Sequence, residues 1–221
     1  MGFMGCNQKE LKNQFAAIGI GALIVFIAII LVAGIAASVL VQTSTTLEMQ
    51  SLKTGRETIT EAATGLTVYG LEGFNDSGLI TKLAIEVTPK AGSPDIDLEN
   101  TIIEISDGNE KHILEFGGAS QHINASSING DLEANGKFGG ATSFGITVLH
   151  DADDSCTNST PIIGFGDHVI LGITTSSVFS SSSGLPPRTD IDGLIIIEEG
   201  APGIIGFTTP ASYVDDIIEL Q

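Results

Sequence analysis

The chain of 221 residues has no tryptophan, two cysteines and few aromatic side chains, which make up 5% of its residues. This shortage argues against an enzyme whose substrate binds in an aromatic-lined pocket. Positive charge is also scarce, because nine lysines and arginines face 27 aspartates and glutamates, giving a formal net charge of −18. Contact with phosphates needs a basic patch, so the composition argues against nucleic acid as a partner.

The most informative absence is local, because no charged residue occurs between Asn13 and Leu47. Residues 16–41 read AAIGIGALIVFIAIILVAGIAASVLV, which is longer than the roughly 20 residues that cross a bilayer as a helix. With no polar stripe, such a helix has to be surrounded on every side by lipid or by protein. Lys9 and Lys12 precede it, and positive charge before a span holds the N-terminus in the cytoplasm.

Two interpretations of this segment remain open from the residues alone: a permanent single-span anchor, or a pilin-type signal that is cut before the apolar helix. A secretory signal peptide has a shorter apolar core and a cleavage site after it, and neither feature occurs here. Small residues stand four positions apart, as in Ala17 and Gly21 or Gly34 and Ser38. This spacing places small side chains on one helix face, where neighbouring helices can approach closely.

The helical pattern continues to about residue 64. A loose apolar stripe runs along residues 47–63, and Gly65 is a typical residue to end a helix. A helix over residues 17–64 would be roughly 70 Å long at about 1.5 Å per residue, which is far more than one bilayer requires. Such a helix, apolar in its first half and amphipathic in its second, suits a filament subunit.

From residue 66 onward the hydrophobic period changes to two, which predicts half-buried strands. The expected strands are Lys82–Val87, Ile102–Ser106, Lys111–Phe116, Ser143–His150, His168–Thr174, Gly193–Ile197 and Gly203–Thr208. The turn sequences between them include Asn75–Gly78, Ala91–Pro94, Asp107–Gly108 and Asn129–Gly130. The serine run at residues 175–184 is expected to be an exposed loop. Many short strands at this spacing predict an antiparallel β-sandwich, so the fold class is α+β.

Residues 17–43, AIGIGALIVFIAIILVAGIAASVLVQT, resemble the mature N-terminus of archaellins, the archaeal flagellins. The resemblance continues through TGRETITEAATGLTVYGLEG, ITKLAIEVTPKAGSPDIDLENTIIEISDG and GAPGIIGFTTPASY, and so covers most of the chain from Ala17 onward. It implies a leader at residues 1–16, a filament-core helix at 17–64 and an immunoglobulin-like outer β-sandwich at 65–221. Many type IV pilins have a glutamate shortly after the cut that releases the leader, whereas the first acid after Ala16 here is Glu48, which favours an archaellin.

The resemblance implies that a prepilin-type signal peptidase cuts between Ala16 and Ala17. The family usually has basic residues and a glycine before this bond, whereas residues 13–16 are NQFA, so the cut lies there or one or two residues away. The released helix is expected to pack against copies of itself. The residues expected in the filament core are Ile18, Gly19, Ile20, Gly21, Leu23, Phe26, Ile27, Ile30, Leu31 and Gly34.

The implied function is therefore that of a structural subunit of the archaeal flagellum (archaellum), a homo-oligomeric helical filament for swimming at the cell surface. Its implied partners are the peptidase, the membrane before assembly, and the motor and assembly proteins of the archaellum. Two alternatives are an adhesive type IV pilus subunit, which is also cleaved, and an uncleaved, membrane-anchored surface β-domain.

The acidic segment around residues 150–155 is the densest candidate site. Asp151, Asp153 and Asp154 offer carboxylates to a hard cation such as Ca²⁺ or Mg²⁺. The alternate spacing mimics the start of an EF-hand, but positions six and twelve of the loop lack the glycine and glutamate that an EF-hand requires. The alternative is an exposed acidic loop. Some archaellin outer domains bind a metal, so the resemblance makes a metal site relevant.

Three sequons, at Asn75, Asn124 and Asn158, predict N-linked glycans on surface loops, a modification that the family often carries. The four histidines form no zinc-type spacing, and nothing adjacent to Cys156 would activate it as a nucleophile. No P-loop, GxGxxG or GxSxG motif occurs. We expect no enzymatic activity and no required cofactor.

Overall fold

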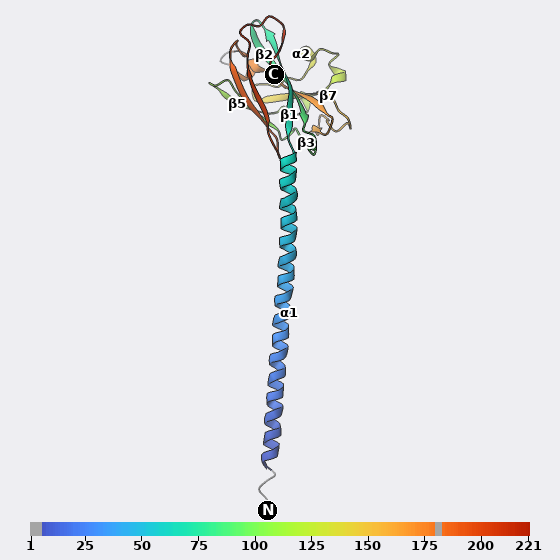
Figure 1. The fold of residues 1–221 in the computed structure, drawn as a ribbon. Helices are drawn as coiled ribbons and strands as arrows, with labels where there is room; N and C mark the ends of the chain where they lie inside the picture. The colour runs from blue at the N-terminus through green and yellow to red at the C-terminus, as the bar shows by residue number, and fades with distance from the viewer. Residues whose placement is uncertain (1–5, 180–182) are drawn as a thin grey trace, which may run out of the picture. The chain divides into compact units, whose positions relative to one another are not determined.

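The computed structural model describes residues 6–179 and 183–221, and the side chains of the N-terminal helix from residue 13 onward. The chain divides into two compact units, Met1–Arg56 and Glu57–Gln221 (Figure 1). The expected fold class is confirmed: a long apolar N-terminal helix is followed by a curled β-sheet domain of mixed, largely antiparallel pairing.

Helix α1 runs from Cys6 to Ala63 and contains 58 residues. It begins before the expected residue 17, because the leader is rich in lysine, glutamine, glutamate and leucine, all good helix formers. It ends one residue before the expected position, where the amide of Thr64 donates to the carbonyl oxygen of Thr60 at 2.8 Å. The stretch Asn13–Ala63 is long and apolar enough to cross a membrane, judged by length and composition.

The β-domain is built from strands of very different length. The strands are β1 Leu66–Asp76, β2 Leu79–Pro89, β3 Ile96–Asp97, β4 Ile102–Ser106, β5 Lys111–Phe116, β6 His122–Asn124, β7 Ser143–His150, β8 Ile162–Ile163, β9 His168–Ile173, β10 Asp190–Ile196, β11 Gly203–Thr208 and β12 Ile217–Glu219. The short helical turns are η1 Ala119–Gln121, η2 Ala125–Ser127, α2 Leu132–Asn135 and α3 Thr175–Val178. All seven expected strands are present, four of them with the expected bounds.

Ten of the described strands form one sheet, in the order β11-β10-β4-β5-β7-β9-β2-β1-β12, with β6 added beside β7. The sheet has two halves, which are joined where Glu115 and Phe116 of β5 pair in parallel with Ser143 and Phe144 of β7. Pairing of β6 with β7 is also parallel. Parallel neighbours need a crossover connection, and residues 117–142 supply it. β3 and β8 form a separate two-stranded sheet.

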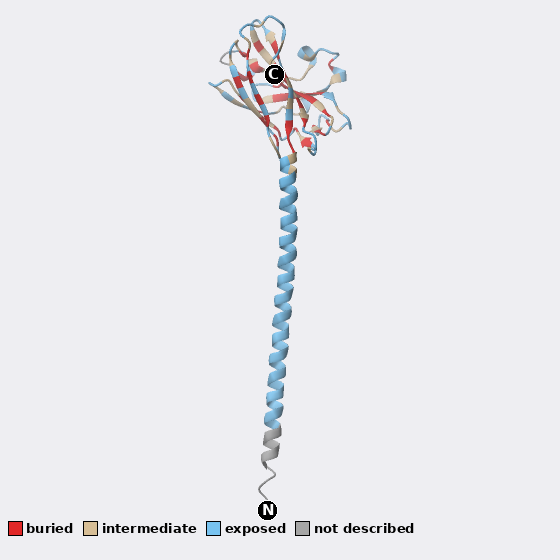
Figure 2. Cartoon of the chain, viewed as in Figure 1, coloured by how far each residue is buried: buried red, intermediate tan, exposed pale blue. Residues whose placement is uncertain are grey.

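The hydrophobic core lies between the two halves of the sheet (Figure 2). Ile103 and Ile105 of β4 alternate with outward residues, and both are fully buried together with Ile85 of β2 and Leu171 of β9. Strands from the two halves therefore bury their inner faces against each other, which is the packing of a β-sandwich. Phe144, at the junction of the halves, is also fully buried.

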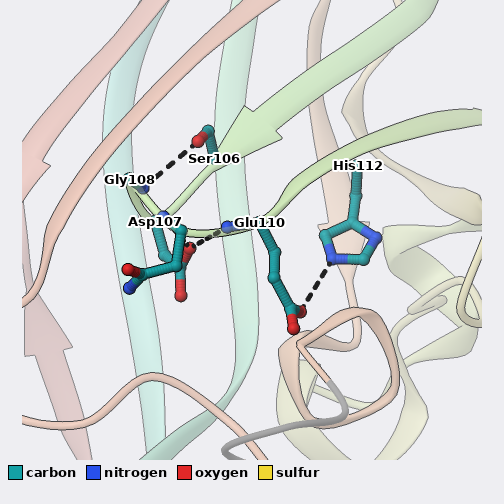
Figure 3. A network of polar contacts seen from close by, with 6 residues as sticks. Ser106, Asp107, Gly108, Glu110 and His112 are labelled. Carbon is teal, nitrogen blue, oxygen red and sulfur yellow. Dashed lines mark hydrogen bonds and ion pairs between the residues drawn. The ribbon is translucent and has the colours of Figure 1, made fainter.

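The two turn sequences that connect β1 with β2 and β4 with β5 form turns, as expected. In the β1–β2 turn, Ser77 and Gly78 have φ values of 56° and 85°, which favours glycine at the second position. In the β4–β5 turn, Gly108 has φ 83°, and the Asp107 carboxylate accepts from the amide of Glu110 at 2.7 Å (Figure 3). The Glu110 carboxylate lies 3.3 Å from His112 Nε2 beyond this turn.

The expectation of an exposed loop at residues 175–184 is wrong for its first part. Residues 175–178 form α3, and Thr175, Val178 and Phe179 are buried. The Thr175 hydroxyl donates to the carbonyl oxygen of Ile80 at 2.6 Å. Val178 and Phe179, the apolar residues within the run, provide the packing that serines alone would lack. Residues 180–182 lie outside the described residues.

Two strand glycines allow a matched test of packing. A Cβ added to Gly172 in β9 would collide with the backbone oxygen of Lys137, whereas one added to Gly206 in β11 would meet no atom within 4 Å. We expect Gly172→Ala to lower the free energy of unfolding of the β-domain by about 1–3 kcal/mol or more. Gly206→Ala should leave it unchanged or slightly raised. Thermal unfolding of both full-length variants measures this, and equal effects would contradict the described approach of residue 137 to β9.

Candidate functional site

The residues expected to form the filament core all lie on α1 and are all exposed. Every described side chain from Asn13 to Ile59 is exposed in the single chain (Figure 2). Among the expected core residues, Phe26 is 64% exposed and Ile27 48%. Large aliphatic residues occur on all sides of the helix, so no single face of it is polar. This surface has to be covered by something outside the single chain.

Three glycines interrupt this apolar surface. Cβ atoms added at Gly19, Gly21 or Gly34 would meet no atom within 4 Å, so the fold of the single chain does not require glycine there. Glycine also weakens a helix by roughly 1 kcal/mol relative to alanine. These glycines therefore do not stabilise the isolated helix. Small residues on a helix face allow a neighbouring helix to approach closely, and this accounts for the glycines.

A band of hydroxyl side chains follows the apolar segment, and sequence reasoning missed its geometry. Thr43, Thr45 and Thr46 each donate a hydrogen bond to a helix carbonyl oxygen three or four residues earlier, at 2.8–3.0 Å. These hydroxyl donors are thus satisfied within the helix itself. A band of this kind can be buried against neighbours without leaving unmet hydroxyl donors.

The acidic cluster of the β-domain differs from the expected one in one member. Oxygen atoms of Asp151, Asp153 and Asp167 lie within 4.8 Å of one another. Asp154 was expected in this set but does not belong to it; its backbone has φ 58°. Asp167, fully sixteen positions after Asp151, enters because β8 and the start of β9 return the chain to this loop. Sequence spacing alone carries no signal for that return.

The three carboxylates are held by backbone amides. Asp167, 1% exposed, accepts from the amides of Gly164 at 2.7 Å and Ala152 at 2.8 Å. Asp151 accepts from the amides of Ser155 at 3.2 Å and Cys156 at 3.0 Å. Hydrogen bonds with Ser155, the largest contribution, lower the pKa of Asp153. All three carboxylates are therefore fixed in position, side by side.

A divalent cation fits this donor set. Calcium binds carboxylate oxygens at about 2.3–2.6 Å, so oxygens around one ion lie up to about 5 Å apart. The separation of 4.8 Å or less among the three aspartates satisfies this condition. Each carboxylate retains free lone pairs after its amide contacts. A bound cation would also offset the mutual repulsion of three neighbouring anions.

Beside this cluster lies the single thiol of the β-domain. Cys156 Sγ is 3.6 Å from His122 Nε2. Burial, with added repulsion from Asp151 and Asp167, raises the pKa of the Cys156 thiol to about 12. Burial also lowers the pKa of His122. Both groups are therefore neutral near pH 7, and the pair is a packed contact without the thiolate that nucleophilic chemistry needs.

We expect Cys156 to resist alkylation in the folded protein. Because its pKa is raised to about 12, the reactive thiolate is rare at about pH 8. Iodoacetamide should leave the Cys156 peptide unmodified in the native protein and modify it fully after denaturation, as measured by mass spectrometry. Rapid modification of the native protein would contradict the burial described here.

The predicted glycosylation sites lie in three different settings. Asn124 in β6 and Asn158 between β7 and β8 are exposed. Asn75, at the end of β1, is half-buried, and its side-chain amide donates to the carbonyl oxygen of Asp215 at 3.3 Å. Asn124 and Asn158 are thus the more accessible of the three.

Comparison with known proteins gives a consistent result. Residues 16–207 match the family model described as archaeal-type flagellin. Flagellin B2 of Methanocaldococcus jannaschii is 44% identical over 216 residues, covering 96% of this chain and 97% of that protein. Flagellin B1 of Methanococcus voltae is 40% identical over 226 residues, covering 97% and 100%.

Solved structures agree. The crystal structure of archaeal flagellin FlaB1 from Methanocaldococcus jannaschii superposes with a TM-score of 0.62 at 33% identity, over 72% of this chain and 98% of that one. The archaeal flagellum of Methanospirillum hungatei shares the fold, with a TM-score of 0.63 at 17% identity over 90% and 98%. The exposed helix contains a long charge-free segment and is followed by this β-domain, and the family match covers most of the sequence. The chain therefore belongs to the archaeal-type flagellin family.

Proposed function

We propose that this chain is a structural subunit of an archaeal flagellum filament at the cell surface, held together by packing of α1 against α1 of other copies. The observation that carries this proposal is the exposed apolar surface of α1, in a chain of the flagellin family. Family membership supports this filament and not an adhesive pilus. As a filament subunit, the protein is non-enzymatic, and its activity lies in assembly.

The apolar surface gives the scale of the interaction. Fifteen large apolar side chains between Ile18 and Val41 are exposed in the single chain. Covering them would stabilise the assembled state by roughly 20–45 kcal/mol relative to exposure in water, at about 1.5–3 kcal/mol each. A free subunit in water is therefore strongly disfavoured, and the filament should dissociate very slowly.

Before assembly, the same surface would be covered by lipid. The step from lipid to a helix bundle gains little from hydrophobicity, because lipid tails are as apolar as leucine. Close packing at Gly19, Gly21 and Gly34 and the work of separate assembly and motor proteins would supply the difference. Head-to-tail contacts that do not close on themselves would then generate an open helical filament.

The precursor would be cut by a prepilin-type signal peptidase between Ala16 and Ala17. The family match begins at residue 16, which supports a mature protein that starts near this bond. Removal of residues 1–16 takes away Lys9 and Lys12. Without them, the charge-free segment becomes the N-terminal part of the mature chain and can enter a bundle without burying a lysine.

The cut can be tested on filaments sheared from cells. We expect their subunit to have the mass of residues 17–221 plus any glycan, with an N-terminal sequence that starts at or within two residues of Ala17. N-terminal sequencing and intact-mass analysis check this. A subunit that retains Lys9 and Lys12, present singly in membranes, would instead support the membrane-anchored β-domain.

Helix packing predicts a selective effect of Gly34→Leu. In the single chain a larger side chain at position 34 meets no neighbour, and leucine favours the helix by roughly 0.5–1 kcal/mol over glycine. Helicity in detergent, measured by circular dichroism, should therefore be retained, while electron microscopy should find filaments absent or greatly reduced. Val32→Leu is the control, since Val32 is already large and 67% exposed. Normal filaments of Gly34→Leu would argue against close packing there.

We further propose a divalent cation, calcium or magnesium, at Asp151, Asp153 and Asp167. The support is the convergence of three anions, one of them 1% exposed. Such a cation would tie the loop after β7 to the start of β9, and so would stabilise the β-domain without taking part in a reaction.

Two neighbouring aspartates provide a matched test of this site. We expect calcium to raise the unfolding temperature of the EDTA-treated chain and to bind in isothermal titration calorimetry. Asp153→Asn should weaken this binding by at least about tenfold, because it removes one ligand charge. Asp154→Asn, outside the cluster, should bind as the wild type does. Absence of calcium binding, or equal loss in both variants, would contradict the proposed ligands.

N-linked glycans on the filament surface are a further part of the proposal. Asn124 and Asn158 are exposed, which supports their use over Asn75. Pro161 follows the third sequon closely, so Asn124 is the favoured acceptor.

A further inference from the structure

Two Asn-Gly sequences lie close together in the connection between β5 and β7, and the fold holds them differently. They are Asn129-Gly130 and Asn135-Gly136. Glycine has no Cβ and restricts its backbone little. The peptide nitrogen of a glycine can therefore approach the side-chain amide of the asparagine before it more easily than that of any other residue. Asparagine is also one of the thermolabile side chains.

Asn129 and Gly130 occupy the two central positions of an exposed turn. The Asp131 amide closes this turn by donating to the carbonyl oxygen of Ile128 at 3.0 Å. Asn129 and Gly130 have φ values of 50° and 79°, and both are exposed. Positive φ at both central residues is the pattern of a type I′ turn. Neither the Asn129 side chain nor the Gly130 amide has a hydrogen-bond partner among the described residues.

The second sequence is held at both reacting groups. The Asn135 side-chain amide donates to the carbonyl oxygen of Ile128 at 3.2 Å. Its backbone amide donates to the carbonyl oxygen of Asp131 at 3.2 Å, and the Gly136 amide donates to that of Leu132 at 2.8 Å. For Gly136 to approach the Asn135 side chain, these hydrogen bonds have to break.

The related Asp-Gly sequence in the β4–β5 turn is held in the same way. The Asp107 carboxylate accepts from the amides of Asn109 at 2.9 Å and Glu110 at 2.7 Å. The Gly108 amide donates to the Ser106 hydroxyl oxygen at 3.2 Å (Figure 3). Compared with these two sequences, the Asn129-Gly130 turn leaves both the side-chain carbonyl carbon and the following nitrogen unrestrained.

We propose that Asn129 is a self-modification site, at which the side chain loses ammonia through a cyclic imide formed with Gly130. The Gly130 nitrogen gives up its proton and bonds to the side-chain carbonyl carbon of Asn129. The bond from this carbon to the side-chain nitrogen breaks, and that nitrogen leaves as ammonia with the proton. The reaction requires no enzyme, oxidant or reductant, so it proceeds in a single chain and does not depend on the proposed filament.

Solvent water then opens the imide ring. Water adds to one of its two carbonyl carbons, the bond from that carbon to the ring nitrogen breaks, and the nitrogen regains a proton. Opening on one side gives an aspartate at position 129. Opening on the other side gives an isoaspartate, in which the main chain runs through the former side chain. The balance is one water consumed and one ammonia released.

The two products have different structural consequences. An aspartate adds one negative charge to an exposed turn. An isoaspartate adds a methylene group to the main chain between Ile128 and Asp131, so the hydrogen bond that closes the turn loses its geometry. Ile128 is buried, and the Asp131 carboxylate caps α2 by accepting from the Ala134 amide at 2.9 Å. Leu132 of α2 packs on a small apolar cluster of β1, β2 and β9. The isoaspartate therefore loosens this cover of the sheet.

The two Asn-Gly sequences can be compared within one peptide. The full-length chain, produced without glycans, is kept folded in detergent in warm, mildly alkaline buffer. Trypsin releases both sites in residues 112–137, which lie between Lys111 and Lys137 without another lysine or arginine. Tandem mass spectrometry with electron-transfer fragmentation then identifies aspartate and isoaspartate at each position. We expect Asn129 to convert at least about tenfold faster than Asn135, because hydrogen bonds must break only at Asn135.

Denaturation tests whether the fold causes this difference. In denaturant both sites are Asn-Gly sequences in an unfolded chain, so their rates should become similar. Equal rates in the folded chain, or faster conversion of Asn135, would overturn the proposal. An unchanged ratio in denaturant would overturn its structural basis, since the flanking sequence would then set the rates. Conversion of Asn129 to aspartate without isoaspartate would exclude the imide.

Matched glutamine substitutions give a second readout, the release of ammonia by the folded chain. Asn129→Gln should abolish the fast phase of release, because the longer side chain would have to close a larger ring. Asn158→Gln should leave this phase unchanged, since Asn158 is exposed but is followed by serine. Thermal unfolding confirms that each variant is folded. A fast phase that persists in Asn129→Gln, or disappears in Asn158→Gln, would contradict the assignment to Asn129.

Discussion

A helix that is apolar on every side cannot remain in water, and this constraint determines what the rest of the molecule has to do. Helix α1 exposes Ile, Leu, Val and Phe side chains all around its first half. Its polar side chains immediately after that, Thr43, Thr45 and Thr46, donate to the helix backbone. The helix therefore brings few hydrogen-bonding demands to whatever covers it, and either lipid or other helices meet its requirements.

The β-domain solves the opposite problem, because it has to stay folded in water while the helix is covered elsewhere. Its two half-sheets bury their inner faces against each other, and the connection between β5 and β7 covers part of one outer face. Buried side-chain polar atoms among the described residues all have partners. A β-domain that completes its own core in this way can be carried through changes in the environment of the helix without unfolding.

Sequence reasoning located the elements well and their long-range contacts poorly, for a physical reason. The charge-free segment and the alternating strands are local patterns, so strands such as Ile102–Ser106 and the end of α1 could be predicted with correct bounds or nearly so, whereas α1 begins at Cys6 and not at the expected residue 17. Parallel pairing of β5 with β7 depends on a crossover that no local period encodes. The same limit explains the acidic cluster, where Asp154 is adjacent in sequence but Asp167 is adjacent in space. Short strands such as β3, β6 and β8 carry too few residues to display a period at all.

The distribution of charge along the chain fits assembly better than its total does. The chain has a formal net charge of −18, so its copies repel one another, yet an apolar helix requires them to come close. Repulsion between hydrated surfaces is screened over about 8 Å at physiological ionic strength, whereas a charge buried among helices is not screened. Acids are therefore tolerable on the β-domain and costly within the helix bundle. The first acid of the expected mature chain is Glu48, which follows both the apolar segment and the threonine band. This difference in screening favours such an arrangement.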